Sequence, residues 1–321
     1  MNVPGALLFF IAVLFIGLLP VPLLYLFSNL FRFIVFWIIG YRRDMVKKNL
    51  ESSFPGIADI EIKQITYLFY KNLADILIEG IWAFTISRKQ ILNRYRIINP
   101  EVLEPFSDSG QSIIGVTAHY ANWEWGSLSA SLQTDFNVIA FYKPINNKYI
   151  DKFVRWSRSR FGTTLAAINE TSLTFEKCKD SKTLFLMAAD QGMPKKFSER
   201  AFWIPFLNHD TPFLHGMEKH ARLNNLPVIY IEIQRVRRGY YTLELSVFTL
   251  KPLELEEGTL TEMYARKLES IILKKPENWL WSHNRFKLTR QVHIVYIIFE
   301  LFNQYVPAYL EGICQHSVLY A

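Results

Sequence analysis

The stretch that decides the fold is Ile113-Ile114-Gly115-Val116-Thr117-Ala118-His119-Tyr120-Ala121-Asn122-Trp123-Glu124-Trp125-Gly126. Its beginning, residues 113–116, is a short apolar run of the kind that forms a buried strand. Residues 125–132 can wind as a helix, so the polar residues between the two lie in a bend that follows a strand. We therefore expect His119 where the strand ends and Glu124 in or near the first turn of the helix.

The spacing of His119 and Glu124 favours a general base. Across such a bend the two side chains can point into one cleft. A carboxylate on one ring nitrogen of a histidine fixes its tautomer and leaves the other nitrogen free to take a proton from a bound hydroxyl. A chance pairing on a polar surface is the alternative, because this spacing is common. The position at a strand end and the neighbouring Trp123 and Trp125, which could wall a cleft, favour the catalytic interpretation.

Short apolar runs alternate with helical stretches from about residue 94 onward. The expected strands cover 95–98, 112–117, 136–142, 183–189, 228–234 and 240–250, and the expected helices between or after them cover 123–132, 147–160, 172–179, 214–224 and 259–274. Alternation of this kind implies crossover connections. The sequence thus predicts an α/β fold with a mixed, mostly parallel sheet flanked by helices, whose sites lie at the carboxyl ends of strands.

Helix boundaries are marked by capping signals. Asp59 is expected to cap a long helix that reaches about Phe84, since apolar residues recur there at near-helical spacing. The string Ser87-Arg88-Lys89-Gln90 matches a capping box and opens a second helix. Thr259-Leu260-Thr261-Glu262 matches the same pattern and predicts the start of a later one.

The N-terminal residues 1–40 carry a single charged side chain, Arg32. The apolar run within them is long enough to cross a bilayer. Pro20 and Pro22 would kink a spanning helix, or split it into two shorter helices that enter one leaflet and return. No basic residue precedes the run and no small-x-small cleavage site follows it, so we expect a retained membrane anchor and not a cleaved signal peptide.

Charge and cysteine content indicate on which side of the membrane the protein lies and which partners it meets. Four basic residues follow the apolar segment, which marks its cytoplasmic side: Arg42, Arg43, Lys47 and Lys48. The formal net charge of +7 requires an acidic partner, and beside an anchor anionic lipid is a simpler partner than nucleic acid. Cys178 and Cys314 are far apart and lack metal-ligand spacing, so we expect no disulfide and no metal site.

Two further segments carry polar groups that belong near a site. Asp190-Gln191 follows the expected strand 183–189, and Arg155, Arg158 and Arg160 lie on the expected helix 147–160. An Asp-Gln pair after a strand is usually a turn, and an arginine cluster is usually a solvated helix face. Their joint occurrence with the His119 motif favours an anion-binding site.

These residues resemble the signatures of a known family. The pattern His119-x4-Glu124 is similar to that of the glycerolipid acyltransferase superfamily, and several further elements resemble one branch of it, the late acyltransferases of lipid A biosynthesis (lauroyl and myristoyl transferases). In chain order these elements are Tyr41-Arg42-Arg43, Lys48-Asn49-Leu50, Phe54-Pro55, Arg158-Ser159-Arg160, Asp190-Gln191 and Trp279-Leu280-Trp281-Ser282-His283-Asn284-Arg285-Phe286-Lys287. The resemblance extends from the N-terminal apolar segment to about Lys287.

The resemblance implies an enzyme of the inner membrane whose catalytic domain lies on the cytoplasmic face. It would move a fatty acyl group from acyl carrier protein to a hydroxyl on an acyl chain of a lipid A precursor, without a cofactor. By the motif of the family, His119 would be the base, Glu124 its orienting carboxylate, and Arg158 and Asp190 further essential residues. Gln191 and Arg160 are neighbouring candidates for binding substrate or the oxyanion.

Direct attack on the donor is favoured over an acyl-enzyme, because a thioester is already activated and the chain has neither a G-x-S-x-G elbow nor a cysteine in a nucleophile motif. Two alternatives stay open: an acyltransferase that acts on another membrane lipid or glycolipid, and a non-catalytic, membrane-anchored lipid-binding protein. The expected organisation is an anchor (1–40), an acyltransferase domain (41–290) and a C-terminal extension of unknown role (291–321), which includes the apolar run 294–302.

Overall fold

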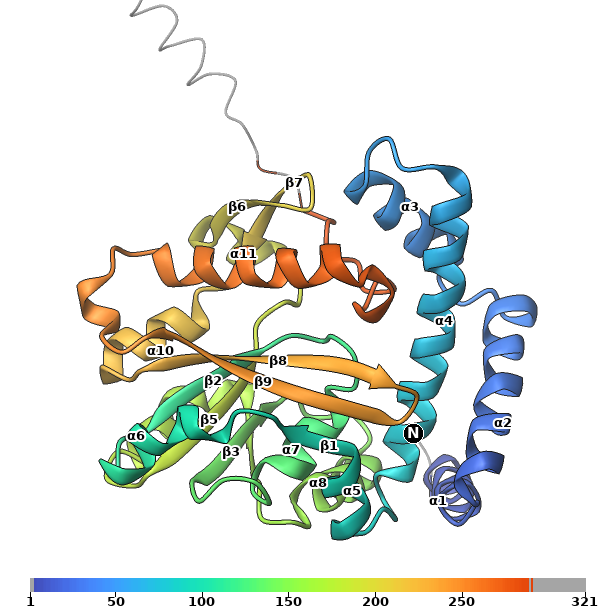
Figure 1. Ribbon diagram of the computed structural model, residues 1–321, viewed down its shortest axis with the longest axis horizontal. Coiled ribbons are helices and arrows are strands. Elements are labelled where there is room, and N and C mark those ends of the chain that lie inside the picture. Colours follow the sequence, from blue (N-terminus) through green and yellow to red (C-terminus); the bar gives the residue numbers. More distant parts are fainter. Residues whose placement is uncertain (1–2, 289, 291–321) are drawn as a thin grey trace, which may run out of the picture. The chain divides into compact units, whose positions relative to one another are not determined.

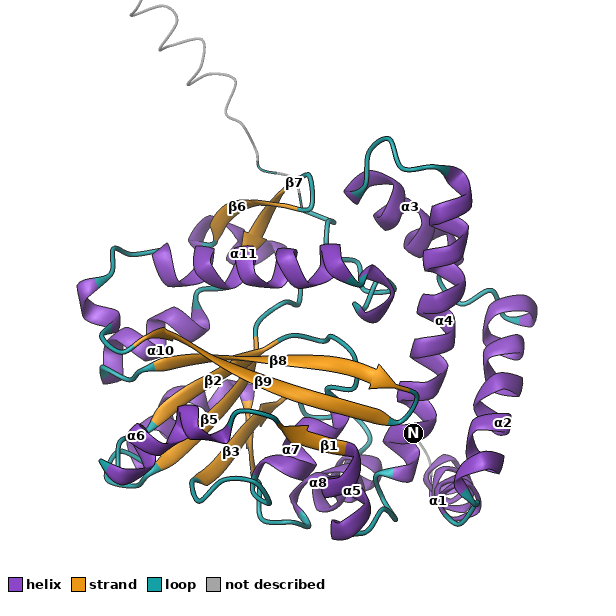
Figure 2. Cartoon of the chain, viewed as in Figure 1, coloured by secondary structure: helices purple, strands orange, loops and turns teal. Residues whose placement is uncertain are grey.

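The computed structural model of the chain describes residues 3–288 and 290 (Figures 1 and 2). A seven-stranded sheet with the order β1-β9-β8-β2-β5-β3-β4 forms its centre. The strands are β1 (Tyr95–Ile97), β2 (Ile113–Thr117), β3 (Asn137–Tyr142), β4 (Thr164–Ala167), β5 (Thr183–Ala188), β8 (Val228–Arg237) and β9 (Tyr240–Thr249). Neighbours pair in parallel except β8 with β9. The expected mixed, mostly parallel sheet is confirmed.

Helices cover both faces of this sheet (Figure 2). The α-helices are α1 (Val3–Gly17), α2 (Val21–Phe33), α3 (Arg43–Ser53), α4 (Asp59–Trp82), α5 (Arg88–Arg94), α6 (Glu104–Asp108), α7 (Glu124–Ala130), α8 (Lys148–Ser159), α9 (Thr171–Lys177), α10 (Gly216–Asn224) and α11 (Thr259–Lys274). Short helical turns are η1 (Ile34–Ile38), η2 (Pro100–Leu103), η3 (Ile168–Glu170), η4 (Lys195–Arg200), η5 (Pro252–Glu254) and η6 (Pro276–Asn278). Figure 1 shows α4 standing beside the tip of the β8–β9 hairpin, with α2 on its outer side.

Strand β2 lies in the middle of the sheet, between β5 and β8. Its apolar side chains Ile113, Ile114 and Val116 are fully buried, as expected for a parallel strand covered on both faces. A Cβ on Gly115 would lie 2.8 Å from a methyl group of Ile231 on β8, so the neighbouring side chains already fill that space. The position of His119, just beyond β2, is therefore held by a closely packed strand in the middle of the sheet.

The N-terminal segment is split into two helices at Pro20, which is the N-cap of α2. Proline has no N–H to continue the helical ladder of α1, and this is one of the two outcomes expected from the sequence. Both helices pack on α4. Within the described residues, Val21–Ile38 is the one segment whose length and composition suffice to cross a membrane, and 11% of it is buried. A signal sequence would meet the same criterion.

Of the three helix caps that the sequence predicts, one is confirmed and two are wrong. The Ser87 capping box is confirmed, since Gln90 N–H donates to Ser87 Oγ (3.3 Å) and Ser87 N–H donates to Gln90 Oε1 (2.9 Å). The expected caps at Asp59 and Thr259 are wrong: α4 begins after Ala58, and α11 begins after Gly258, neither with a side-chain cap from its own N-cap residue.

A distant carboxylate explains the second error. The side chain of Glu218 on α10 accepts hydrogen bonds from the backbone N–H groups of Gly258 (2.6 Å) and Thr261 (2.9 Å). The first turn of α11 is thus capped through tertiary contact, which local sequence does not reveal. Strand β4 and the hairpin formed by β6 (Phe202–Phe206) and β7 (His209–Phe213) were also not expected. The apolar run 294–302 lies outside the described residues.

Candidate active site

His119 lies just beyond the carboxyl end of β2, and its ring contacts Asp190. The ring nitrogen Nδ1 is 2.7 Å from Asp190 Oδ1, and the backbone N–H of His119 donates to the same oxygen at 3.0 Å. Asp190 follows β5, which pairs with β2 in parallel, with Thr117 opposite Ala188. Because parallel neighbours end at the same edge of a sheet, the two segments that follow them bring the imidazole and the carboxylate together.

Asp190 is almost fully buried, with 4% of its surface exposed. Its second oxygen, Oδ2, accepts a hydrogen bond from Trp279 Nε1 at 3.1 Å. Burial alone would raise the pKa of the Asp190 carboxyl, but the charge of His119 and the hydrogen bonds from His119 and Trp279 outweigh it, so this pKa lies below its ordinary value. Asp190 is therefore an ionised carboxylate that holds one face of the imidazole.

The other ring nitrogen of His119 faces an exposed side chain. His119 Nε2 is 2.9 Å from Gln191 Nε2. With the Nδ1 proton donated to Asp190, Nε2 carries the lone pair and accepts a hydrogen bond from the Gln191 amide. Burial lowers the pKa of His119, but Asp190 and, more weakly, Glu124 raise it, and the net shift is upward. This imidazole can act as a base at Nε2, where an acceptor hydroxyl can displace the exposed Gln191 amide.

Glu124 is not the carboxylate on the ring. It is the first residue of α7, and its Oε2 accepts a hydrogen bond from Arg158 on α8 at 2.6 Å, while Oε1 accepts one from Trp123 Nε1 at 3.2 Å. The expectation that Glu124 orients His119 is thus corrected in its geometry, because Asp190 holds Nδ1. Since α7 packs on α8, the arginine of α8 is the charged neighbour that Glu124 meets.

The three arginines of the 147–160 segment have different neighbours. Arg158 forms the ion pair with Glu124. Arg160 donates to the carbonyl oxygens of Ala83 and Ile86, just after α4, and Arg155 lies over the ring of Tyr142. Of the three, Arg158 is the one that the structure brings to the His119 motif.

Three strings of the resemblance lie against one another, and the third is far from the first two in the sequence. Asn49 Nδ2 donates to the carbonyl oxygens of Trp281 (2.8 Å) and His283 (3.1 Å), and Arg42 Nη1 donates to that of Ser282 (2.7 Å). These bonds hold the segment that carries Trp279, the donor to Asp190. The sequence identified all three strings but not their contact, and it did not identify Trp279 as a site residue.

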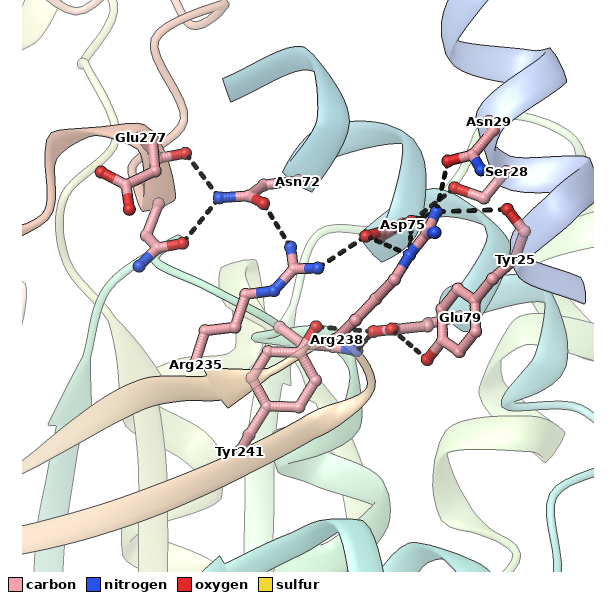
Figure 3. Close-up of polar contacts among 12 residues, drawn as sticks. Tyr25, Ser28, Asn29, Asn72, Asp75, Glu79, Arg235, Arg238, Tyr241 and Glu277 are labelled. Carbon is pink, nitrogen blue, oxygen red and sulfur yellow. Dashed lines mark hydrogen bonds and ion pairs between the residues drawn. The ribbon is translucent and has the colours of Figure 1, made fainter. Parts of the chain in front are cut away.

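A second buried carboxylate supports the bend between His119 and Glu124. Asn122 Nδ2 donates to Glu79 Oε2 at 2.7 Å, and Asn122 Oδ1 accepts from the backbone N–H of Trp125 at 3.1 Å. In Figure 3, Glu79 also accepts from Tyr25 on α2 and Tyr241 on β9, both at 2.7 Å. Burial raises the pKa of Glu79, and the nearby charge of Asp75 adds to the rise.

The same bend contains strained backbone. Ala121 has a φ of 50°, in the left-handed region that residues with a Cβ seldom adopt. Its N–H donates to the carbonyl oxygen of Asn278 at 2.9 Å, and Tyr120 forms a bridge with Trp279. The turn after β2 is therefore held in shape by the same C-terminal segment that places Trp279 on Asp190.

Within the part of the chain that the structure describes, no group of three or more His, Cys, Asp or Glu side chains is placed to hold a metal ion. The groups at and around His119 are an imidazole, carboxylates, an arginine and an amide. Such groups can move a proton to and from a bound hydroxyl.

The model of the bacterial lipid A biosynthesis acyltransferase family matches residues 3–288. The chain belongs to this family. It is similar to the lipid A biosynthesis lauroyltransferase of Escherichia coli (strain K12), at 22% identity over 272 residues that cover 84% of this chain and 87% of the relative. It is equally similar to the lipid A biosynthesis palmitoleoyltransferase of the same organism, at 22% identity over 254 residues that cover 78% and 80%. The protein is an acyltransferase, and the site around His119 is its candidate reaction centre.

Proposed function

We propose that this acyltransferase moves a fatty acyl group from acyl carrier protein to a hydroxyl of a lipid A precursor by direct attack on the thioester, without an acyl-enzyme and with His119 as the general base. The observation that carries the proposal is the arrangement of the imidazole. Its Nδ1 is held by the buried Asp190 at 2.7 Å, and its Nε2 faces the exposed amide of Gln191 at 2.9 Å.

The reaction begins when the acceptor hydroxyl displaces the Gln191 amide and donates its hydrogen bond to His119 Nε2. As Nε2 takes the proton, the hydroxyl oxygen attacks the thioester carbonyl, and Asp190 stabilises the imidazolium that forms. The tetrahedral intermediate then collapses, the carbon–sulfur bond breaks, and the imidazolium returns its proton to the thiolate that leaves. General-base catalysis of this kind contributes roughly 10²–10⁴-fold to the rate.

Glu124 and Arg158 act beside the base in this proposal. The carboxylate of Glu124 raises the pKa of His119, whereas Arg158 lowers it, so the pair keeps a nearly balanced charge next to the imidazole. A guanidinium has five N–H donors, and Arg158 has donors left besides the one bonded to Glu124. These donors make Arg158 a candidate for stabilising the oxyanion, a role that contributes about 10²–10³-fold where it has been measured.

Membrane attachment is part of the proposal. Helices α1 and α2 expose large apolar side chains, among them Leu7, Leu8, Leu14, Leu26 and Leu30. We assign these helices to the inner membrane, with the catalytic domain on the cytoplasmic face. This assignment is supported by the basic residues that follow them, because such residues favour the cytoplasmic side and attract anionic headgroups.

The substitution His119→Ala tests the chemistry. Purified protein is incubated with acyl carrier protein that bears a labelled acyl group and with a lipid A precursor, and the product is identified by mass spectrometry. We expect His119→Ala to lower kcat by roughly 10³-fold or more while the thermal unfolding curve stays close to that of the wild type. Near-normal turnover by a folded His119→Ala protein would rule out the base. Acyl transfer to a different lipid in the same assay would rule out the acceptor.

A further inference from the structure

A basic hollow of about 240 Å³ lies between α4, the end of β8 with the turn that follows it, and η6. Its wall includes five cationic side chains and one carboxylate: Lys71, Arg235, Arg237, Arg238, Lys275 and Glu277. Neither the sequence motifs nor the comparisons assign any role to these residues. An excess of positive charge gathered around a concave surface calls for an anionic ligand.

Two of the five cations are already paired. Arg235 Nη2 lies 2.6 Å from Asp75 Oδ2 and Arg238 Nη2 lies 2.5 Å from Asp75 Oδ1, and Asp75 is fully buried beneath them (Figure 3). Asn72 accepts a hydrogen bond from Arg235 and donates to the carbonyl oxygen of Glu277. This network joins α4, β8 and η6 into a fixed floor, so the hollow is preorganised.

The other three cations are available. Within the described part of the chain, Lys71, Arg237 and Lys275 form no ion pair. Arg237 lies over the ring of Tyr240, 3.9 Å from its centre, and this contact holds the guanidinium in place while leaving its N–H donors free. Lysine and arginine side chains of this kind are the usual partners of phosphate groups in proteins.

The hollow lies between an apolar helix and the reaction centre. On one side, Arg238 donates to the Tyr25 carbonyl oxygen (3.2 Å) and to Asn29 Oδ1 (2.9 Å) on α2. On the other side, Asn278 also lines a narrow crevice bounded by Trp123 and Trp279. The ring of Trp123 lies 5.4 Å from that of His119, and Trp279 donates to Asp190.

We infer that this hollow binds a phosphate group carried by the lipid acceptor. A lipid that approaches along α2 brings its polar head to the side of the molecule where Lys71, Arg237 and Lys275 lie. Anchoring a phosphate there leaves the rest of the head free to reach along η6 toward His119. The inference rests on the proposed function and adds to it the group by which the acceptor is recognised.

The test is a triple variant, Lys71→Gln, Arg237→Gln and Lys275→Gln. Arg235 and Arg238 are left intact, because removing them would leave the buried Asp75 without a partner. The matched control removes the same number of exposed cations elsewhere, with Lys63→Gln on the same helix α4, Lys274→Gln beside Lys275, and Lys219→Gln on α10. We expect KM for the phosphorylated acceptor to rise roughly fivefold per cation, or about 100-fold in the triple variant, with kcat and the control variant nearly unchanged.

Two further comparisons identify the source of the phosphate. With an acceptor whose phosphates have been removed, the triple variant and the wild type should have equal KM values, and KM for the acyl carrier protein donor should not change. The inference is overturned if KM for the dephosphorylated acceptor rises as well, if KM for the donor rises instead, or if the triple variant loses only its binding to phosphatidylglycerol vesicles.

A binding measurement separates this inference from the proposed function. Equilibrium binding of phosphorylated and dephosphorylated acceptor is measured in detergent micelles, with no turnover required. Weaker binding of the phosphorylated acceptor alone by the triple variant supports the hollow even if the wild type fails to transfer acyl groups. Equal binding by wild type and triple variant overturns it even if acyl transfer is observed.

Discussion

Asp190 and Glu79 are two buried carboxylates that contact the same bend, at His119 and at Asn122, and their environments differ. Asp190 meets a titratable base, since His119 contacts it twice and Trp279 donates to its other oxygen. Glu79 meets neutral donors, the hydroxyls of Tyr25 and Tyr241 and the amide of Asn122. The pKa of Asp190 lies below its ordinary value, and that of Glu79 lies above it.

The difference shows that burial does not by itself decide the protonation state of a carboxylate. Desolvation is the largest cause at both residues and raises the pKa of each. A positive partner reverses the shift at Asp190. At Glu79 the hydrogen bonds from neutral donors only partly offset the desolvation, and the nearby charge of Asp75 raises the pKa further. We therefore assign Asp190 an electrostatic role in catalysis, which is to stabilise the imidazolium of His119. Glu79 has a positioning role, because its hydrogen bond with Asn122 holds the bend that contains His119.

The largest effect is expected from Asp190→Asn. An amide at this position can donate to Nδ1 and leave the proton of His119 on Nε2, which abolishes the base, so kcat should fall roughly 10³–10⁴-fold. Glu124→Gln removes a carboxylate that does not touch the ring, and kcat should fall only about tenfold. Steady-state kinetics of both variants measures the two falls in kcat and shows which carboxylate the reaction depends on more. A larger loss from Glu124→Gln would mean that Glu124 takes over the ring in the reacting complex.

Substitution of Glu79 should act on stability instead. Glu79→Ala leaves Tyr241 and Asn122 without their buried acceptor and should lower the free energy of unfolding by about 3 kcal/mol. Glu79→Gln keeps the shape and most of the hydrogen bonds and should cost far less. Urea unfolding with both variants measures this. The comparison fails if Glu79→Gln lowers kcat as strongly as Asp190→Asn does.

The same two carboxylates give opposite pH dependences. The folded state binds the proton of Glu79 more tightly than the unfolded state does, so this contribution to stability is present below the ordinary value of 4.5 and is lost as pH rises through the folded pKa. Asp190 has the reverse sign, and its contribution is lost as pH falls below 3.8 toward the lowered pKa. Relative to the wild type, Glu79→Gln should therefore gain stability with rising pH, and unfolding curves over a pH series measure it.

An effect as small as that of Glu124→Gln is expected from Trp279→Phe. This change keeps most of the aromatic packing but removes the N–H that donates to Asp190 Oδ2 at 3.1 Å. Loss of one hydrogen bond to a charged group corresponds to about 1.5–3 kcal/mol, and kcat should fall roughly tenfold. The pH at which kcat/KM rises to half its plateau, which reports the His119 pKa, should move. An unchanged profile would show that Trp279 serves packing alone.

Much of the fold follows from local patterns. The apolar runs at β2, β3, β5, β8 and β9 have the length and composition of strands, and the capping box at Ser87 marks the start of α5 from four adjacent residues. Strand β4, Thr164–Ala167, was not expected because a segment of four residues, two of them alanines, gives no such signal. The caps of α4 and α11 were predicted incorrectly, because a Thr or Asp side chain near the start of a helix does not always accept a hydrogen bond from the first helical turn. At α11 a distant glutamate accepts these hydrogen bonds instead.

The sequence by itself determined that His119 follows a buried strand, that Asp190-Gln191 follows another, and that the two belong to one site at the carboxyl edge of a parallel sheet. Only the tertiary structure decided which carboxylate holds the imidazole. Glu124 is nearer in the chain, but β5 is the hydrogen-bonded neighbour of β2, and strand order brings Asp190 to the ring while α8 brings Arg158 to Glu124. Strand order depends on how the whole chain buries its apolar surface, so no local spacing contains it.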